Sequence, residues 1–402
     1  MKRYDSYKDS GVKWLGEIPS HWEVRKMKFT FKERSKKGFP TLPLLAATQN
    51  HGVIKKEEYE YRTVEATKSL ETLKLVEVGD FVISLRSFQG GIELCHDKGI
   101  ISPAYTILCP INISGSYFKH LGKSSIFIQL LKSMVTGIRE GQNIDYCKLR
   151  ENILPIPSAE EQESIANYLD ATTSKIDKAI AQQQKMIDLL NERKQIIINN
   201  AVTKGLAPNV KMKSSGVDWI GEIPEHWEIR KVKAFGPIKS GDGIKNSELS
   251  DEGKYPVWGG NGLMGFTDRY NKDKNAIVIG RVGALCGNVR YLSIPTFVTD
   301  NALILSLSNN IDHNYLLNAL IAANLNSLNT SNAQPLITGA KVKNVVIPYP
   351  PLGEQNIIVQ RLNILVDHID NAIINCNKQI SLLQERKQII INDVVTGKVK
   401  VI

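Results

Sequence analysis

Paired cysteines and long apolar runs are missing from this 402-residue sequence. Its five cysteines stand far apart without a CxxC pair, which argues against a zinc module and against a disulfide framework. No apolar run approaches the roughly 18 residues that a membrane helix needs. The first ten residues, MKRYDSYKDS, are polar and charged, so no signal peptide is expected. We therefore expect a cytoplasmic protein that does not contact membranes.

Motifs that carry chemistry are absent as well. The sequence has no GxxxxGK[ST] loop, no HExxH and no histidine spacing suited to a metal, so we expect no metal site and no catalytic residues. A base-methylating enzyme would need an Asn/Asp-Pro-Pro-aromatic tetrapeptide, which YPPL at 349–352 does not match. One GxGxxG occupies 260–265, but the polar sequence after it does not predict the helix of a dinucleotide site. We interpret it as a loop whose backbone approaches another surface, such as DNA phosphates.

The chain is basic, with 51 Lys and Arg against 41 Asp and Glu and a net charge of +10. Such an excess suits a polyanionic partner because cations neutralise phosphates, although many proteins of similar charge never bind nucleic acid. Hydrophobic residues make up 42% and charged residues 23%, as in ordinary globular proteins. The length allows two or three domains.

Two phrases occur twice. SGVKWLGEIPSHWEVRKMK at 10–28 returns as SGVDWIGEIPEHWEIRKVK at 215–233, an offset of 205 residues. LLNERKQIIINNAVT at 189–203 returns as LLQERKQIIINDVVT at 382–396, an offset of 193. A period near 200 residues is too long for a solenoid and indicates two whole domains, each followed by a helix. The offsets differ by 12, so the segments between the shared phrases are not equivalent.

Four segments alternate along the chain. Residues 1–153 are expected to form a first α/β (α+β) domain, with strands near 75–78, 81–85 and 105–108 and a helix near 124–135. Residues 154–203 begin with LPIP and continue as a long helix that Ser158 opens, and Glu160 and Glu161 complement its dipole. Residues 204–346 combine a linker with a second mixed domain (strands near 275–279 and 302–306, a helix near 315–325). Residues 347–402 repeat the proline segment and the helix.

Both long helices carry heptad repeats. The first has Leu169, Ile176, Gln183, Leu190 and Ile197 in one series, and the second has Leu362, Ile369, Cys376, Leu383 and Ile390 in the same register. An apolar seam of 3.5-residue periodicity over about five heptads predicts a coiled-coil pair. Lys194 and Lys387 occupy matching seam positions. They indicate either the fraying end of the seam or a contact with another protein.

Four of the five tryptophans, Trp14, Trp22, Trp219 and Trp227, lie in the repeated phrase at 10–28 and 215–233, which we call the clasp. They could stack on bases or pack the first strand of each domain on the helices. Identical phrases in otherwise different domains favour packing, and the same holds for His21 and His226. The fifth, Trp258, lies in the unshared glycine-rich region and is the better candidate for a ligand contact.

Polar loops that are not shared by the two domains are the expected recognition elements, because Arg, Asn and Gln read base edges. The predicted DNA-binding residues are Arg34, Lys36, Lys37, Gln49, Asn50, Arg86, Ser87, Gln89, Arg139, Gln142, Lys239, Ser240, Asn261, Arg281, Arg290, Thr330 and Gln334. For any one of them an ordinary exposed loop is the alternative. A twin charged patch on the helices (Glu192, Arg193, Lys194, Glu385, Arg386 and Lys387) is either a solvated face or a docking site for two copies of one partner.

The full layout resembles the specificity (S) subunits of type I restriction–modification systems. The matching residues are the clasp openings at 10–23 and 215–228, the proline segments LPIPSAEEQ and PYPPLGEQ, the LLxERKQIIIN helices, and GIISPAY at 99–105. The order of these duplicated motifs makes the resemblance specific, and it covers essentially the whole chain. The joined termini would recreate the passage 201–223, as in a pseudo-twofold ring cut at one linker.

The resemblance implies two target-recognition domains, each reading one half of a bipartite double-stranded DNA site, joined by an antiparallel coiled coil that fixes their separation. It implies two methyltransferase (M) subunits as partners and motor–nuclease (R) subunits as a further partner. S-adenosylmethionine, ATP and Mg are expected on those subunits, and no cofactor on this non-catalytic chain. The alternative is a coiled-coil adaptor that holds two identical proteins without sequence-specific DNA binding.

Overall fold

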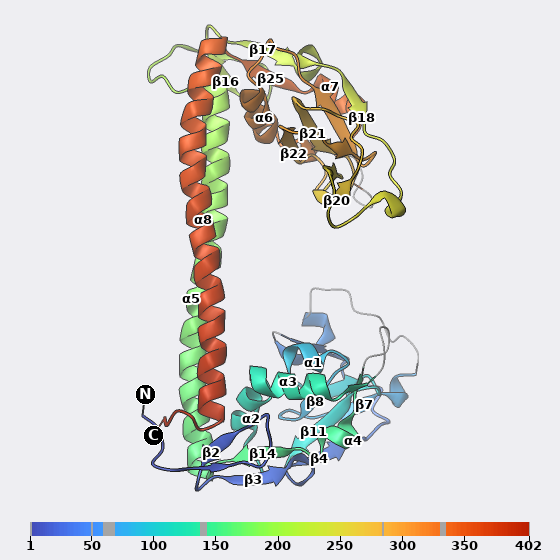
Figure 1. The fold of residues 1–402 in the computed structure, drawn as a ribbon, viewed down its shortest axis with the longest axis vertical. Coiled ribbons are helices and arrows are strands. Elements are labelled where there is room, and N and C mark those ends of the chain that lie inside the picture. Colours follow the sequence, from blue (N-terminus) through green and yellow to red (C-terminus); the bar gives the residue numbers. More distant parts are fainter. Residues whose placement is uncertain are drawn as a thin grey trace. The chain divides into compact units, whose positions relative to one another are not determined.

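The computed structural model describes residues 2–49, 51–58, 69–136, 143–283, 285–329 and 335–401. The chain divides into two compact units: unit 1 comprises 1–183 and 378–402, and unit 2 comprises 184–377. Two long helices, α5 (Ala159–Lys204) and α8 (Leu352–Val395), each contribute one segment to unit 1 and one to unit 2 (Figure 1).

Unit 1 is built around a four-stranded antiparallel sheet in the order β4 (Phe31–Arg34), β11 (Thr106–Pro110), β8 (Phe81–Ile83), β9 (Glu93–Leu94). Two-stranded pairs surround it: β5 (Leu45–Thr48) with β6 (Gly52–Lys55), β7 (Lys74–Val76) with β10 (Gly99–Ile101), and β12 (Val135–Thr136) with β13 (Asn143–Ile144). Its short helices are α1 (Ser87–Gly90), α2 (Gly115–Leu121), α3 (Ser125–Ser133) and α4 (Tyr146–Leu149).

Unit 2 repeats the sheet order with β18 (Ile238–Ser240), β24 (Ala302–Ser306), β21 (Ala276–Gly280) and β22 (Val289–Leu292). A second sheet joins β20 (Leu263–Thr267), β19 (Tyr255–Trp258) and β23 (Phe297–Val298). The short helices are α6 (His313–Ala322) and α7 (Gly339–Asn344). The predicted strands and helices of both domains are therefore present. The helix expected at 315–325 begins earlier because Asp312 caps its N-terminus, and it ends at Ala322.

The clasp forms the same pair of ribbons in each unit. In unit 1, β1 (Tyr7–Asp9) pairs with β2 (Glu17–Pro19), and β3 (Glu23–Lys26) pairs with the proline-containing β14 (Ile153–Ile156). In unit 2, β15 (Met212–Ser214) pairs with β16 (Glu222–Pro224), and β17 (Glu228–Lys231) pairs with β25 (Val346–Tyr349). The first and last described segments meet in unit 1, where Lys400 N donates to Lys2 O at 2.9 Å.

Within each unit the start of one long helix packs against the end of the other. In unit 1, Ile165 and Leu169 of α5 share a core with Ile391 and Val394 of α8. In unit 2, the start of α8 (358–362) shares a core with the end of α5 (198–202). The two helix segments of each unit are therefore antiparallel (Figure 1).

A buried tyrosine ties these helices to the domain in each unit. Tyr117 Oη of α2 donates to Val395 O, the last residue of α8, at 3.1 Å. Tyr315 Oη of α6 donates to Val202 O near the end of α5 and to Pro348 O, both at 3.2 Å. The bonds to Val395 O and Val202 O satisfy carbonyls that the helix ends leave without an intrahelical partner, and the bond to Pro348 O reaches strand β25. The sequences around the two tyrosines differ, so repeat analysis did not single them out.

Candidate nucleic-acid interface

In both units the predicted recognition loops begin at the equivalent edge of the four-stranded sheet. In unit 1 this edge is formed where β4 and β8 end and where β9 and β11 begin, since Arg34 pairs with Ile107, Ile83 with Thr106 and Val82 with Glu93. In unit 2 it lies where β18 and β21 end and where β22 and β24 begin. We call these the unit 1 edge and the unit 2 edge.

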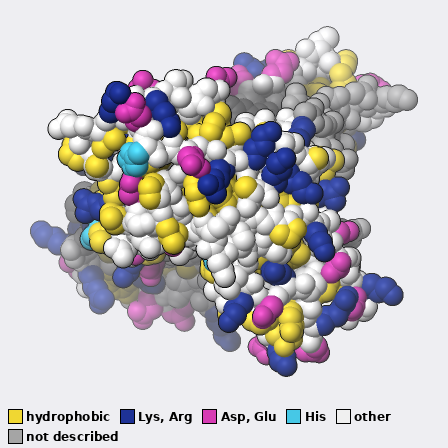
Figure 2. All heavy atoms as spheres, turned by 90° about the horizontal axis from the view of Figure 1, so that it is seen from above, with side chains coloured by type: hydrophobic (Ala, Val, Ile, Leu, Met, Phe, Trp, Pro, Cys, Tyr) yellow, Lys and Arg dark blue, Asp and Glu magenta, His cyan; other side chains and the backbone are white. Residues whose placement is uncertain are grey.

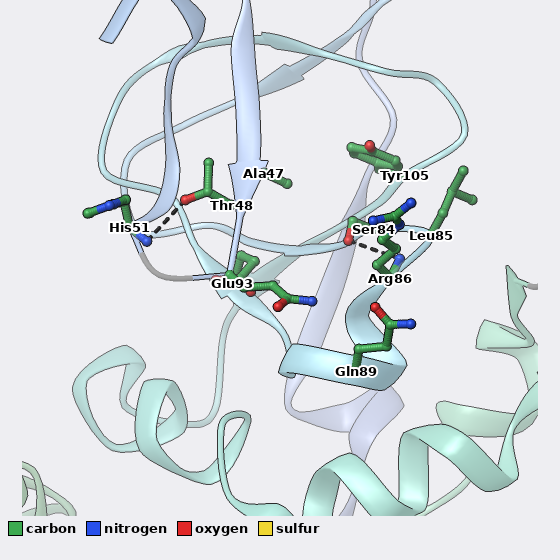
Figure 3. A pocket seen from close by; sticks show the side chains of 10 residues that line it. Ala47, Thr48, His51, Ser84, Leu85, Arg86, Gln89, Glu93 and Tyr105 are labelled. Atoms are coloured by element: carbon green, nitrogen blue, oxygen red, sulfur yellow. Dashed lines mark hydrogen bonds between the residues drawn. The ribbon is translucent and has the colours of Figure 1, made fainter. Parts of the chain in front are cut away.

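A cavity of about 470 Å³ opens at the unit 1 edge. Its walls come from the β5–β6 turn, the segment after β8, the start of β9 and Tyr105 before β11 (Figure 3). Three predicted DNA-binding residues line it together: Gln49, Arg86 and Gln89. Their side-chain polar atoms make no hydrogen bond to another described residue and remain available to a ligand.

Other predicted residues of unit 1 are placed differently. Arg34 is held by Asp80, with Nε 2.7 Å from Oδ2, and this hydrogen bond raises the pKa of the guanidinium. Ser87 is buried, and its Oγ accepts from Ser84 N at 2.9 Å. Both side chains therefore have partners within the edge, and the base contacts expected of them stay a prediction. Lys36 and Lys37 are exposed after β4. Asn50, Arg139, Gln142, Thr330 and Gln334 lie outside the described residues.

The unit 2 edge gathers five side chains of the glycine-rich region. Arg281 Nη1 donates to Ser240 Oγ at 3.5 Å. The guanidinium carbon of Arg290 lies 4.6 Å from the ring centroid of Trp258, within the range of a cation–π contact. Asn261 is exposed beside the backbone of residue 283. Trp258, which lies outside the clasp and is the better candidate for a ligand contact, thus lies among predicted recognition residues.

The glycine loop at 259–262 approaches the chain's own backbone. A Cβ on Gly280 would lie 2.2 Å from Gly260 O, and a Cβ on Gly260 would lie 2.7 Å from Asn301 O. Only glycine allows the loop to lie this close to the ends of β21 and β24. The close approach that we assigned to DNA phosphates is therefore an internal one, and it places Asn261 at the unit 2 edge.

Two charged residues behind the unit 1 cavity were not predicted. Glu93, the first residue of β9, is 3% exposed, and its Oε1 accepts from Lys123 Nζ at 2.5 Å. Burial raises the pKa of Glu93 to about 7, against the attraction of Lys123. Lys123 follows α2 and also donates to Gln49 O at 3.0 Å. A single Glu in a β-like run and a Lys after a helix give no sequence signal, because only the fold brings them together.

The clasp tryptophans are structural, as expected. Trp22 and Trp227 are fully buried, and their Nε1 atoms donate to first-turn carboxylates of the long helices. Trp22 Nε1 lies 3.3 Å from Glu161 Oε1 of α5, and Trp227 Nε1 lies 2.9 Å from Glu354 Oε2 of α8. His21 and His226 contact the same two carboxylates at 3.0 and 2.6 Å.

The seam lysines have partners within the chain. Lys194 Nζ lies 2.7 Å from Asp370 Oδ2 in unit 2, and Lys387 Nζ lies 2.6 Å from Asp177 Oδ1 in unit 1. These ion pairs correct the interpretation as a frayed end of the seam, whereas a contact of the two lysines with another protein stays a prediction. The rest of the predicted docking patch, Glu192, Arg193, Glu385 and Arg386, is exposed.

Lys and Arg side chains are spread between apolar and acidic ones on the face that Figure 2 shows. Among the described residues no cluster of three or more His, Cys, Asp or Glu could hold a metal ion. In the same part of the chain no helix is sufficiently long and apolar to span a membrane.

Comparison with known proteins agrees with this architecture. Residues 224–381 match the family model described as type I restriction modification DNA specificity domain. The putative type I restriction enzyme MjaX specificity subunit of Methanocaldococcus jannaschii is 27% identical over 98% of both chains. The MjaVIII specificity subunit of the same organism is 29% identical over 68% of this chain and 69% of its own.

A solved structure shows the same fold over nearly the whole chain. It comes from work on complex assembly and conformational transition of a type I R-M system, with a TM-score of 0.70, 15% identity, and coverage of 95% of this chain and 99% of its own. The solved structure shows the fold alone, whereas the family model and both curated relatives concern DNA specificity. By these matches the chain is similar to the DNA specificity subunits of type I restriction–modification systems.

Proposed function

We propose that this chain is the non-catalytic subunit that reads a bipartite double-stranded DNA site, one half with each domain. The observation that carries the proposal is the pair of equivalent sheet edges. Both present polar side chains suited to base edges, yet the residues differ: Gln49, Arg86 and Gln89 in unit 1, against Arg281 and Arg290 in unit 2. A shared frame with different reading residues suits two different half-sites.

Two methyltransferase subunits are the proposed partners, one on each helix patch. Leu189 and Ile196 of α5 are 50% and 52% exposed, and their repeats Leu382 and Ile389 of α8 are 54% and 51% exposed. Each pair flanks an exposed arginine on one helix face, since residues at i, i+4 and i+7 align. Apolar side chains around an arginine are typical of the centre of a protein interface. S-adenosylmethionine would be bound by these partners, and ATP and Mg by motor–nuclease subunits.

Selection from a random duplex library tests the reading function. The full chain, assembled with its methyltransferase subunits, is expected to enrich two short sequences separated by an unspecified spacer. The methyltransferase subunits alone serve as the control and should enrich nothing. If the assembled complex enriches no sequence, the chain is instead an adaptor that only holds two proteins.

The long helices are proposed to set the spacer between the half-sites. Inserting one heptad in α5 after Gln183 and one in α8 after Cys376 keeps the seam periodicity and adds about 10 Å to each helix. Because base pairs rise by about 3.4 Å, the selected spacer should lengthen by about three base pairs. An unchanged spacer in the selected sequences would refute this role.

A further inference from the structure

We infer that Gln49 reads an adenine in the half-site bound by unit 1, and that Lys123, Glu93 and Gly90 are positioning residues for it. This inference rests on the proposed function and names one base that the unit 1 edge recognises. It begins with the turn between β5 and β6. Thr48 Oγ1 accepts from His51 N at 3.0 Å and donates to Gly52 O at 2.9 Å, so the turn that carries Gln49 is closed by its own side chain.

Gly90 leaves room for the Gln49 side chain. It is the last residue of α1, and a Cβ added there would lie 2.7 Å from Gln49 Cγ and 2.9 Å from Cδ. The side chain of Gln49 therefore lies against bare backbone of α1, the helix that also carries Gln89. Any larger residue at position 90 would push the amide away from this place.

Lys123 anchors the backbone of Gln49 from the other side. Its Nζ donates to Gln49 O at 3.0 Å and to Glu93 Oε1 at 2.5 Å. Glu93 lies in the wall of the same cavity and is almost fully buried at the start of a sheet strand. The ammonium group of Lys123 thus connects the β5–β6 turn, which carries Gln49, to the core of the domain.

The amide of Gln49 has the chemistry of an adenine reader. It offers one acceptor and one NH₂ donor, which match N6 and N7 of adenine in the major groove. It is exposed and makes no hydrogen bond to another described residue. No internal hydrogen bond therefore has to break when the amide binds a base. Because Lys123 holds the backbone carbonyl of Gln49, less backbone entropy is lost on binding than in an unanchored turn.

Gln129 supplies a matched control. It is an exposed glutamine on α3 of the same unit and does not line the cavity. The full chain, assembled with its methyltransferase subunits, is first used to select its site from random duplexes. Competition binding then compares short duplexes carrying each of the four base pairs at every position of the unit 1 half-site.

Gln49→Ala is expected to abolish the preference for adenine at one position, a loss of about 5- to 150-fold given 1–3 kcal/mol for a bidentate pair. Preferences at all other positions should stay unchanged. Gln129→Ala should leave that adenine preference intact. An adenine preference that survives Gln49→Ala, or that Gln129→Ala removes, would overturn the inference.

The positioning residues are tested by the same readout. Lys123→Met and Gly90→Ala should weaken the adenine preference with little loss at the other half-site, and Lys123→Arg should restore most of it. If Lys123→Met lowers binding equally for all four base pairs, Lys123 contributes charge or stability and no positioning. A wild-type complex without any selected site would instead reject the proposed function, so the two failures are distinguishable.

Discussion

Lys194 of α5 and Asp370 of α8 form an ion pair across the helix seam, with both carboxylate oxygens within 2.8 Å of Nζ. The pair repeats in unit 1 as Lys387 and Asp177, at the same offset of 193 residues in each helix. Two identical polar pairs in a largely apolar seam favour one antiparallel register, because any slip would leave the ammonium groups without carboxylates.

Reversing one charge tests this relationship. Lys194→Asp should destabilise unit 2 because it places a second carboxylate beside that of Asp370. The double variant Lys194→Asp, Asp370→Lys should recover most of the lost free energy of unfolding. Both groups are partly exposed, so the coupling energy should be about 0.5–1 kcal/mol. Urea unfolding of the four variants of the cycle measures it. Lys185→Asp, at an exposed position of the same helix, is the control, and equal effects at positions 185 and 194 would contradict the account.

The clasp carboxylates should be required for stability in each unit separately. Glu161→Ala leaves the buried Trp22 Nε1 without its acceptor and should cost unit 1 about 1–3 kcal/mol. Hydrogen exchange measured peptide by peptide should then show faster exchange in unit 1 and unchanged exchange in unit 2. Glu160→Ala removes an exposed neighbouring carboxylate and serves as the control. Protection lost equally with both substitutions would argue against the clasp.

Stability should depend on pH through Glu93, whose pKa burial raises to about 7 from an ordinary 4.5. The folded chain then keeps a proton that the unfolded chain releases, so this contribution is fully present below pH 4.5 and is lost as pH rises through 7. Glu93 faces Lys123 and shares its cavity with His51 and Arg86.

Glu93→Gln, which stays neutral, should therefore gain stability relative to wild type between pH 5 and 8, by an amount on the order of 1–3 kcal/mol. Urea unfolding at a series of pH values measures this difference, with the exposed Glu71→Gln as the control. A difference between Glu93→Gln and wild type that does not change with pH would show that the buried carboxyl is ionised throughout.

Arg290 and Trp258 should act in the half-site that Gln49 does not touch. Arg290→Ala removes the guanidinium that lies over the indole and should weaken base preference in the unit 2 half-site alone. Arg269→Ala is the matched control, because Arg269 is exposed in the same unit but is paired with Glu248 at 2.9 Å. Selection from random duplexes should show one altered half for Arg290→Ala and none for Arg269→Ala. A change in both halves would contradict the assignment of one half to each unit.

Sequence repeats predicted the parts of the fold that both units share. The clasp was identified because Trp22 and Trp227 stand in identical surroundings, and the heptads located α5 and α8 to within a few residues. Tyr117 and Tyr315 each donate a hydrogen bond to a carbonyl at the end of a long helix. The sequence repeats do not mark them, because their neighbours in the sequence differ. The partners of the seam lysines were missed because Asp177 and Asp370 lie beside the apolar seam positions on the opposite helix.

The proposed recognition residues could be selected only as a set, and their contacts with bases stay a prediction. Polar loops after strands located Gln49, Arg86 and Arg290 at the sheet edges, because strand ends of an antiparallel sheet gather there. The sequence does not indicate that Arg34 is hydrogen-bonded to Asp80. Nor does it indicate that Lys123 donates a hydrogen bond to Gln49, which lies 74 residues away in the sequence. Such pairings depend on the tertiary fold, which loop composition does not encode.

The most direct measurement of the central claim is an exchange of one reading domain. Residues 29–153, which lie between the clasp and α5, would be replaced by the corresponding segment of a type I specificity subunit. The complex with methyltransferase subunits would again select from random duplexes. The account predicts that one half of the selected site changes to that of the donor while the other half stays as in wild type. Two unchanged halves would contradict it.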